Sequence, residues 1–166
     1  MTAAVLPPNH YGVGSIKSFI PHRYPVLLVD RVLAVVPGES ITTLKAITCN
    51  EPWFEGIPED CQDSEYAYPT PLLIESWCQS AALLAAWDRD ADALAGTVAL
   101  FGGMSGIEAG GRVLPGDLVR HEVRISRAMA DTWFFEGVST VDGEPVLRVA
   151  DVMTALRPSA ALSPTD

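Results

Sequence analysis

The sequence is poor in basic residues and in cysteine. It contains 11 lysines and arginines against 21 acidic residues, which gives a formal net charge of -10. Nucleic acids and anionic membranes gain affinity from cationic patches, so this balance predicts neither as a partner. The three cysteines, Cys49, Cys61 and Cys78, lack a paired spacing such as C-x-x-C. This absence argues against a disulfide framework or a zinc site, and we expect free thiols and no bound metal.

Long apolar segments are also missing. The most apolar stretch, residues 70–87, carries a Glu and a Gln and is shorter than the roughly 20 apolar residues of a membrane span. The first residues lack the basic start and apolar core of a signal peptide, so we expect a cytoplasmic protein. A chain of 166 residues, 48% of them hydrophobic, suits one domain with a real core. We expect an arm at 1–14, a domain at 15–157 and a disordered tail at 158–166.

Residues 70–87 are predicted to form a buried helix on which the fold is organised. Thr70 suits the N-cap position, and Pro71 suits the first helical position. Beyond Pro71, the polar side chains of this stretch are Glu75, Ser76, Gln79 and Ser80. A helix that is apolar almost all round needs cover on most sides. Glu75 and Gln79 share one face, and a carboxylate in such a setting is costly unless it is paired, so Glu75 is a candidate functional residue.

The rest of the chain is predicted to consist of strands and turns. We expect a short helix at 15–20 capped by Ser15, a turn at 20–25, and strands at 26–36, 41–48, 97–101, 118–128, 132–141 and 144–156. A long loop at 50–69, a type that is often functional, precedes the buried helix. Glycines at 102–111 indicate strand kinks or bulges rather than a phosphate loop. The prediction is an α+β fold, an antiparallel sheet wrapped round one helix, whose exposed edges favour dimerisation.

Four segments of the chain carry recognisable motifs in a fixed order. They are Ile-Pro-His-Arg-Tyr-Pro-Val-Leu-Leu-Val-Asp-Arg-Val at 20–32, Asn-Glu-Pro-Trp-Phe-Glu-Gly at 50–56, Pro-Thr-Pro-Leu-Leu-Ile-Glu-Ser-Trp-Cys-Gln at 69–79, and Val-Leu-Pro-Gly-Asp at 113–117. Together they resemble the signatures of the 3-hydroxyacyl-[acyl carrier protein] dehydratases, hotdog-fold enzymes of fatty acid and polyketide synthesis. The resemblance implies a hotdog fold without metal or nucleotide cofactor. It implies an acyl thioester substrate carried on phosphopantetheine, as part of acyl carrier protein or coenzyme A.

The resemblance also implies a two-residue acid/base site. In the family, a His on the loop before the helix removes the proton beside the thioester carbonyl. A Glu or Asp early in the helix of the other subunit helps the 3-hydroxyl leave as water. Glu75 takes the second role. The His is missing, because the family's Gly-His-Phe-Pro is here Gly56-Ile57-Pro58, followed by a longer stretch before Pro69.

The start of the helix departs from the family as well. The small residue of the family's Pro-Gly turn is here Thr70, between two prolines, and Pro71 has no N–H with which to polarise a carbonyl. The positions that the resemblance assigns to substrate binding are Gly56, Ile57, Thr70, Pro71 and Gln79.

Other residues could replace the missing base. His22 and His121 are expected to be structural or solvent-facing, and His10 lies on the arm. Tyr66, Tyr68 and Cys61 lie nearer to the lost position, but a tyrosine pKa near ~10 makes a poor base at neutral pH.

We favour a function in the dehydratase lineage, and two alternatives stay open beside it. The chain is half of a dehydratase whose site is completed by a His-bearing paralogue in a heterodimer, or a thioester hydrolase that uses Glu75. The third possibility is a non-catalytic subunit that binds acyl groups or supports assembly. The sequence leaves a homodimer and a heterodimer equally open.

Overall fold

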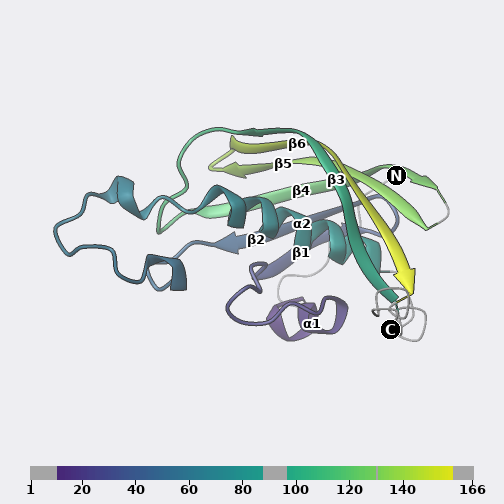
Figure 1. The fold of residues 1–166 in the computed structure, drawn as a ribbon, viewed down its shortest axis with the longest axis horizontal. Coiled ribbons are helices and arrows are strands. Elements are labelled where there is room, and N and C mark those ends of the chain that lie inside the picture. Colours follow the sequence, from purple (N-terminus) through teal and green to yellow (C-terminus); the bar gives the residue numbers. More distant parts are fainter. Residues whose placement is uncertain (1–10, 88–96, 130, 159–166) are drawn as a thin grey trace, which may run out of the picture.

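A computed structural model describes residues 11–87, 97–129 and 131–158 of the chain. One long helix lies against a curved antiparallel sheet of six strands (Figure 1). The elements are α1 (Val13–Phe19), β1 (Arg31–Val36), β2 (Ser40–Ala46), η1 (Pro52–Phe54), η2 (Asp63–Tyr66), α2 (Thr70–Ala86), β3 (Thr97–Ala109), β4 (Leu118–Met129), β5 (Thr132–Val141) and β6 (Glu144–Pro158). The strand order is β1-β2-β4-β5-β6-β3. The expected α+β architecture is confirmed. Most of the expected arm and tail lies outside the described residues.

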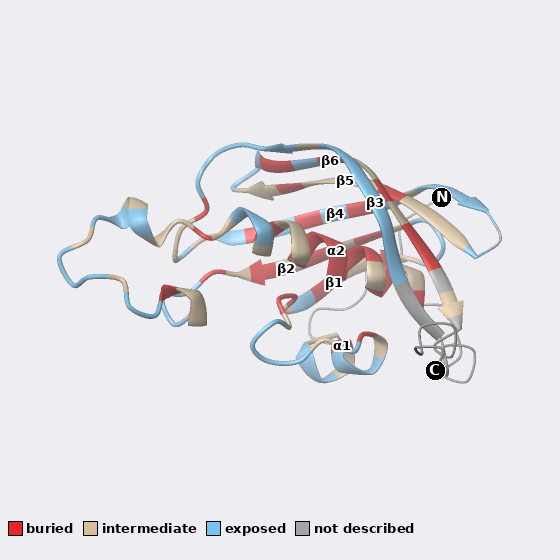
Figure 2. Cartoon of the chain, viewed as in Figure 1, coloured by how far each residue is buried: buried red, intermediate tan, exposed pale blue. Residues whose placement is uncertain are grey.

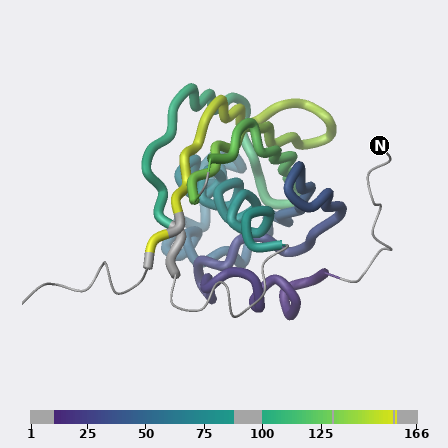
Figure 3. Tube along the Cα trace, turned by 90° about the vertical axis from the view of Figure 1, so that its right-hand side faces the viewer, coloured from purple at the N-terminus to yellow at the C-terminus, as the bar shows by residue number. Residues whose placement is uncertain are grey.

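The central helix α2 is buried along most of its length (Figure 2). It packs on β2, β4 and β5, and α1 contacts it from another side (Figure 3). Trp77, Ala81 and Leu83 are fully covered, as their place in a nearly all-apolar helix predicts. Among the described helices, none is both long enough and apolar enough to cross a bilayer.

Buried polar side chains connect α2 to the sheet beneath it. Ser76 Oγ lies 2.9 Å from His121 Nε2, and His121 Nδ1 lies 2.7 Å from Ser139 Oγ on the next strand. One turn further along, the hydroxyls of Ser80 and Thr43 are 2.7 Å apart. Burial, with a smaller contribution from the charge of Lys45, lowers the pKa of His121 to about 3. The imidazole is therefore neutral at ordinary pH and serves the packing of the helix.

Several boundaries differ from those that the sequence predicts. Thr70 does not cap α2, because the helix begins there and the amides of Leu72 and Leu73 both donate to the carbonyl of Pro69. Ser15 likewise lies inside α1 rather than capping it. The first strand begins at Arg31, not at residue 26, because a side chain of α2 binds the backbone of 26–28 in place of a neighbouring strand.

The edge strand β3 is longer than predicted and runs through the glycine-rich segment. Its pairing with β6 shifts register between Phe101 and Gly103, so the predicted bulge is present. Gly106 adopts a φ of +59°, a conformation that favours glycine. The loop before α2, predicted as irregular, contains the two short 3₁₀ turns η1 and η2.

Gly137 on β5 lies against the backbone of β4. A Cβ atom built at this position would stand 2.0 Å from the carbonyl oxygen of Glu122. We expect Gly137→Ala to lower the free energy of unfolding by about 1–3 kcal/mol, because the two strands must separate. Urea unfolding measures the change. Gly103→Ala, where a Cβ meets no atom within 4 Å, is the control. Equal stability of the two variants would contradict the close approach.

The buried His121 makes stability depend on pH in one direction. Its folded pKa of about 3 lies below its ordinary value of 6.5, so the unfolded chain binds more protons between these limits. Its contribution is complete above pH 6.5 and decreases by about 1.4 kcal/mol per pH unit towards pH 3. We expect His121→Gln to flatten the fall in unfolding free energy between pH 6.5 and pH 5, measured by urea unfolding. Identical slopes in both proteins would exclude this role of His121.

Candidate active site

Glu75 lies on the second turn of α2, on the face that also carries Pro71 and Gln79. These three residues are spaced four apart and therefore lie one above another along the helix. The side chain of Glu75 is 39% exposed. The carboxylate thus lies at the boundary between the covered helix and solvent, where a substrate could reach it.

Gln79 binds Glu75 and the chain segment before β1 at the same time. Its Nε2 donates to the carbonyl of Val26 at 2.7 Å and to Glu75 Oε1 at 2.9 Å. Its Oε1 accepts the amide N–H of Leu28 at 2.9 Å. The side chain is buried, and the hydrogen bonds compensate for the cost of burying an amide. Gln79, a predicted substrate-binding residue, thereby holds the carboxylate and the chain entering β1.

His22 meets Glu75 from the turn before that segment. Its Nε2 lies 3.3 Å from Glu75 Oε1, and 27% of its side chain is exposed. Arg23 stiffens the turn, because its guanidinium donates to the carbonyl of Ile20 at 2.9 Å and to that of Lys17 at 3.0 Å. The sequence pointed to a structural or solvent-facing His22. The structure places it beside the candidate carboxylate.

The contact with His22 favours the ionised form of Glu75. The hydrogen bond from His22 lowers the pKa of the Glu75 carboxyl, burial opposes it, and the bond from Gln79 adds to the lowering. Glu75 is therefore a carboxylate at neutral pH. Both donors bind Oε1, and within the described ranges Oε2 has no hydrogen-bond partner. Cys78, next along the helix, is a buried thiol whose pKa is raised to about 12, chiefly by burial, so it is not a nucleophile.

The loop before α2 brings no histidine to this helix. Gly56 is exposed at a φ of +82°, while Ile57, at the position of the family's His, packs partly against the apolar core. Thr70 and Pro71 are exposed at the start of α2. Their roles in substrate binding, with those of Gly56 and Ile57, stay predictions.

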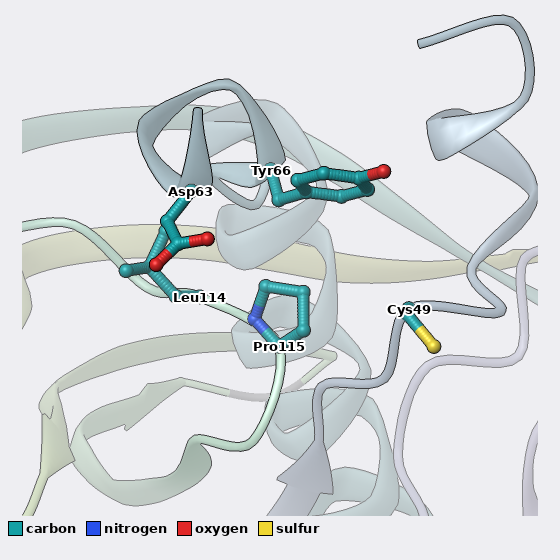
Figure 4. A pocket seen from close by; sticks show the side chains of 5 residues that line it. All are labelled: Cys49, Asp63, Tyr66, Leu114 and Pro115. Atoms are coloured by element: carbon teal, nitrogen blue, oxygen red, sulfur yellow. The ribbon is translucent and has the colours of Figure 1, made fainter. Parts of the chain in front are cut away.

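The tyrosines of the loop are unsuited to act as bases. A hydrogen bond with Cys61 raises the pKa of Tyr66, and burial raises that of Tyr68 further above its ordinary value. Tyr66 faces a pocket of about 250 Å³ between the loop and the turn at 114–117 (Figure 4). The residues lining it are Cys49, Asp63, Tyr66, Leu114 and Pro115. Glu75 and His22 do not line this pocket. In the part of the chain that the structure covers, no group of His, Cys, Asp or Glu side chains could hold a metal ion.

The base of the loop is fixed by a buried ion pair. Lys45 Nζ lies 2.6 Å from Glu51 Oε1 and 3.8 Å from Asp30 Oδ2, and the Lys45 side chain is 7% exposed. Lys45 also donates to the carbonyl of Ala46 at 2.8 Å. The loop therefore leaves β2 at a defined place.

Solved structures define the class of fold to which this arrangement belongs. The dehydratase heterocomplex ApeI:P from Xenorhabdus doucetiae superposes with a TM-score of 0.71 and 15% identity, over 89% of this chain and 93% of that chain. A hot-dog-like protein from Thermanaerovibrio acidaminovorans gives a TM-score of 0.58 and 13% identity, over 76% and 86% of the two chains. The protein has a hotdog fold, as the resemblance implied.

Sequence comparison narrows the class to a family. The model of the FabA-like domain matches residues 20–150. The 3-hydroxyacyl-[acyl-carrier-protein] dehydratase FabZ of Polynucleobacter asymbioticus is 38% identical over 149 residues, which cover 90% of this chain and 95% of the relative. The chain therefore belongs to the FabZ-type 3-hydroxyacyl-[acyl-carrier-protein] dehydratase family, of which it is a member without the loop His.

We expect Gln79→Leu to destabilise the protein by at least about 2 kcal/mol, because the amide of Leu28 and the carbonyl of Val26 would both lose a buried partner. Denaturant unfolding gives the value. Ser126→Ala, which removes an exposed bond to the carbonyl of Phe134, is the control and should change stability by less than about 0.5 kcal/mol. A Gln79→Leu variant as stable as this control would refute the anchoring role.

Proposed function

We propose that this chain is one subunit of a 3-hydroxyacyl thioester dehydratase and supplies Glu75 to a site completed by the loop His of a paralogous partner. The observation that carries the proposal is the ionised, half-exposed carboxylate of Glu75 in a family member whose own loop presents Ile57. The substrate is a 3-hydroxyacyl chain on the phosphopantetheine of acyl carrier protein, in fatty acid or polyketide synthesis. No metal or nucleotide takes part.

Elimination of water needs one proton removed and one delivered. The partner's imidazole takes the proton from C2, the electrons of that bond form the C2–C3 double bond, and the C3–O bond breaks. The departing hydroxyl takes up the proton from the imidazolium and leaves as water. The carboxylate of Glu75 accepts a hydrogen bond from the 3-hydroxyl and holds it beside the imidazole, so that the leaving group is placed before the bond breaks.

The edge of the sheet supports a two-subunit assembly. β3 is one of the two edge strands of the sheet, and its Phe101 and Met104 side chains are 45% and 47% exposed. An exposed apolar edge strand is a surface that a second strand can cover. The solved neighbour from Xenorhabdus doucetiae, a dehydratase heterocomplex, is a precedent for such a pair within the fold.

The test is reconstitution of the site from two chains. The full chain is purified alone and with a His-bearing FabZ-type paralogue from its own organism, and formation of the conjugated enoyl thioester from a 3-hydroxyacyl-acyl carrier protein is followed by its absorbance. We expect no dehydration by the chain alone and dehydration by the pair. Glu75→Gln should lower the activity of the pair at least about 100-fold, the range of general acid/base effects.

The matched control is the corresponding substitution in the partner subunit. Its own helix carboxylate faces the loop of this chain, which has no His, so its replacement by Gln should leave the rate unchanged. If that replacement abolished turnover while Glu75→Gln did not, the paralogue would be acting as a homodimer and the proposal would be wrong. Release of free thiol by the chain alone would instead identify a thioesterase. Partner binding without turnover, insensitive to Glu75→Gln, would identify a non-catalytic subunit.

A further inference from the structure

His22 and Gln79 bind the same oxygen of Glu75 from two directions. Gln79 approaches along the helix at 2.9 Å, and His22 approaches from the turn before β1 at 3.3 Å. Both contacts restrain Oε1. The second oxygen, Oε2, is left to meet a substrate.

The two ring nitrogens of His22 have different surroundings. Its Nδ1 is buried and has no hydrogen-bond partner among the described residues. An N–H at that nitrogen would be a buried donor without an acceptor, which is costly. Among the described residues, the polar contact of the ring is therefore the one between Nε2 and Glu75 Oε1.

We propose that His22 is a positioning residue of the Glu75 site: its Nε2–H holds Oε1, and Oε2 is thereby the oxygen that accepts the substrate hydroxyl. The inference rests on the proposed role of Glu75 and adds a second residue to it. In this proposal His22 acts on the carboxylate and is not needed to stabilise the turn. Arg23 stabilises the turn through its bonds to the carbonyls of Ile20 and Lys17.

The other titratable group that faces Glu75 does not position its carboxylate. The titratable groups that face it in the described structure are His22, from the turn, and Cys78, from α2 itself. The thiol of Cys78 stays protonated and is 3% exposed, so it neither charges the site nor competes for Oε1. A change in the pKa of the Glu75 carboxyl therefore reflects a change in its contacts with His22 and Gln79.

The experiment compares His22→Leu with His22→Gln, which retains an N–H donor. In the full chain, the Glu75 carboxyl is titrated by carbon NMR, with Glu75→Gln identifying its signal. We expect its pKa to lie below 4.5 in the parent protein, to rise in His22→Leu because burial then acts with one donor fewer, and to stay below the His22→Leu value in His22→Gln. In the reconstituted pair, we expect kcat to fall about 10- to 100-fold in His22→Leu and to recover in His22→Gln.

Two results would overturn the inference. One is a Glu75 pKa that does not change in His22→Leu while that variant stays folded by circular dichroism. The other is a loss of kcat in His22→Gln as large as in His22→Leu with the Glu75 pKa kept low, because His22 would then transfer protons itself. Tyr24 lies on the same turn and is 85% exposed, so Tyr24→Ser is the control. It should change neither the pKa of Glu75 nor kcat. If the pair shows no dehydration at all, the proposed function fails, and the titration still decides the role of His22.

Discussion

The side chain of Gln79 is the constraint on which the candidate site depends. An amide inside an apolar helix must find partners, and Gln79 finds them in the backbone of Val26 and Leu28 and in the carboxylate of Glu75. This one set of bonds delays the start of β1 and places the turn before it against α2. It also holds Glu75 at the edge of the core. On the sheet side, the Ser76–His121 contact fixes the rotation of the same helix.

Local chemistry accounts for the parts of the fold that the sequence predicts well. β5 and β6 follow from two alternating segments around Asp142-Gly143, where both residues adopt a positive φ. The length of α2 follows from its apolar run. The start of β1 and the missing cap at Thr70 could not be predicted, because they depend on contacts with distant or unexpected backbone groups. Propensity and periodicity describe neighbours in sequence, so they miss the distant Gln79 side chain that binds the segment before β1. At Thr70 the error is local, because the adjacent carbonyl of Pro69 accepts the first helical amides.

Part of the candidate site, Glu75 and Gln79, could be predicted from the sequence, whereas the contact with His22 could not. Glu75 and Gln79 stand out because each is a polar residue in an apolar helix, which is visible in the sequence alone. Their polarity indicates that each side chain needs a hydrogen-bonding partner, but it does not identify that partner. His22 gave no such signal, since a histidine in a proline-flanked turn has many structural uses. Folding brings it to Glu75 because Gln79 binds the segment that immediately follows the turn.

The electrostatics of the described residues favour the proposal that a second subunit completes the Glu75 site. His121 is sealed between α2 and the sheet with a pKa of about 3, and burial or a thiol contact raises the pKa values of Tyr68 and Tyr66. His22 directs its donor to Glu75 Oε1. These four side chains are thus unfit or engaged, while Oε2 of an ionised carboxylate stays open. A carboxylate of this kind orients a hydroxyl but does not by itself remove the weakly acidic proton beside a thioester. In the function that we propose, the loop of a partner subunit supplies the base that this proton requires.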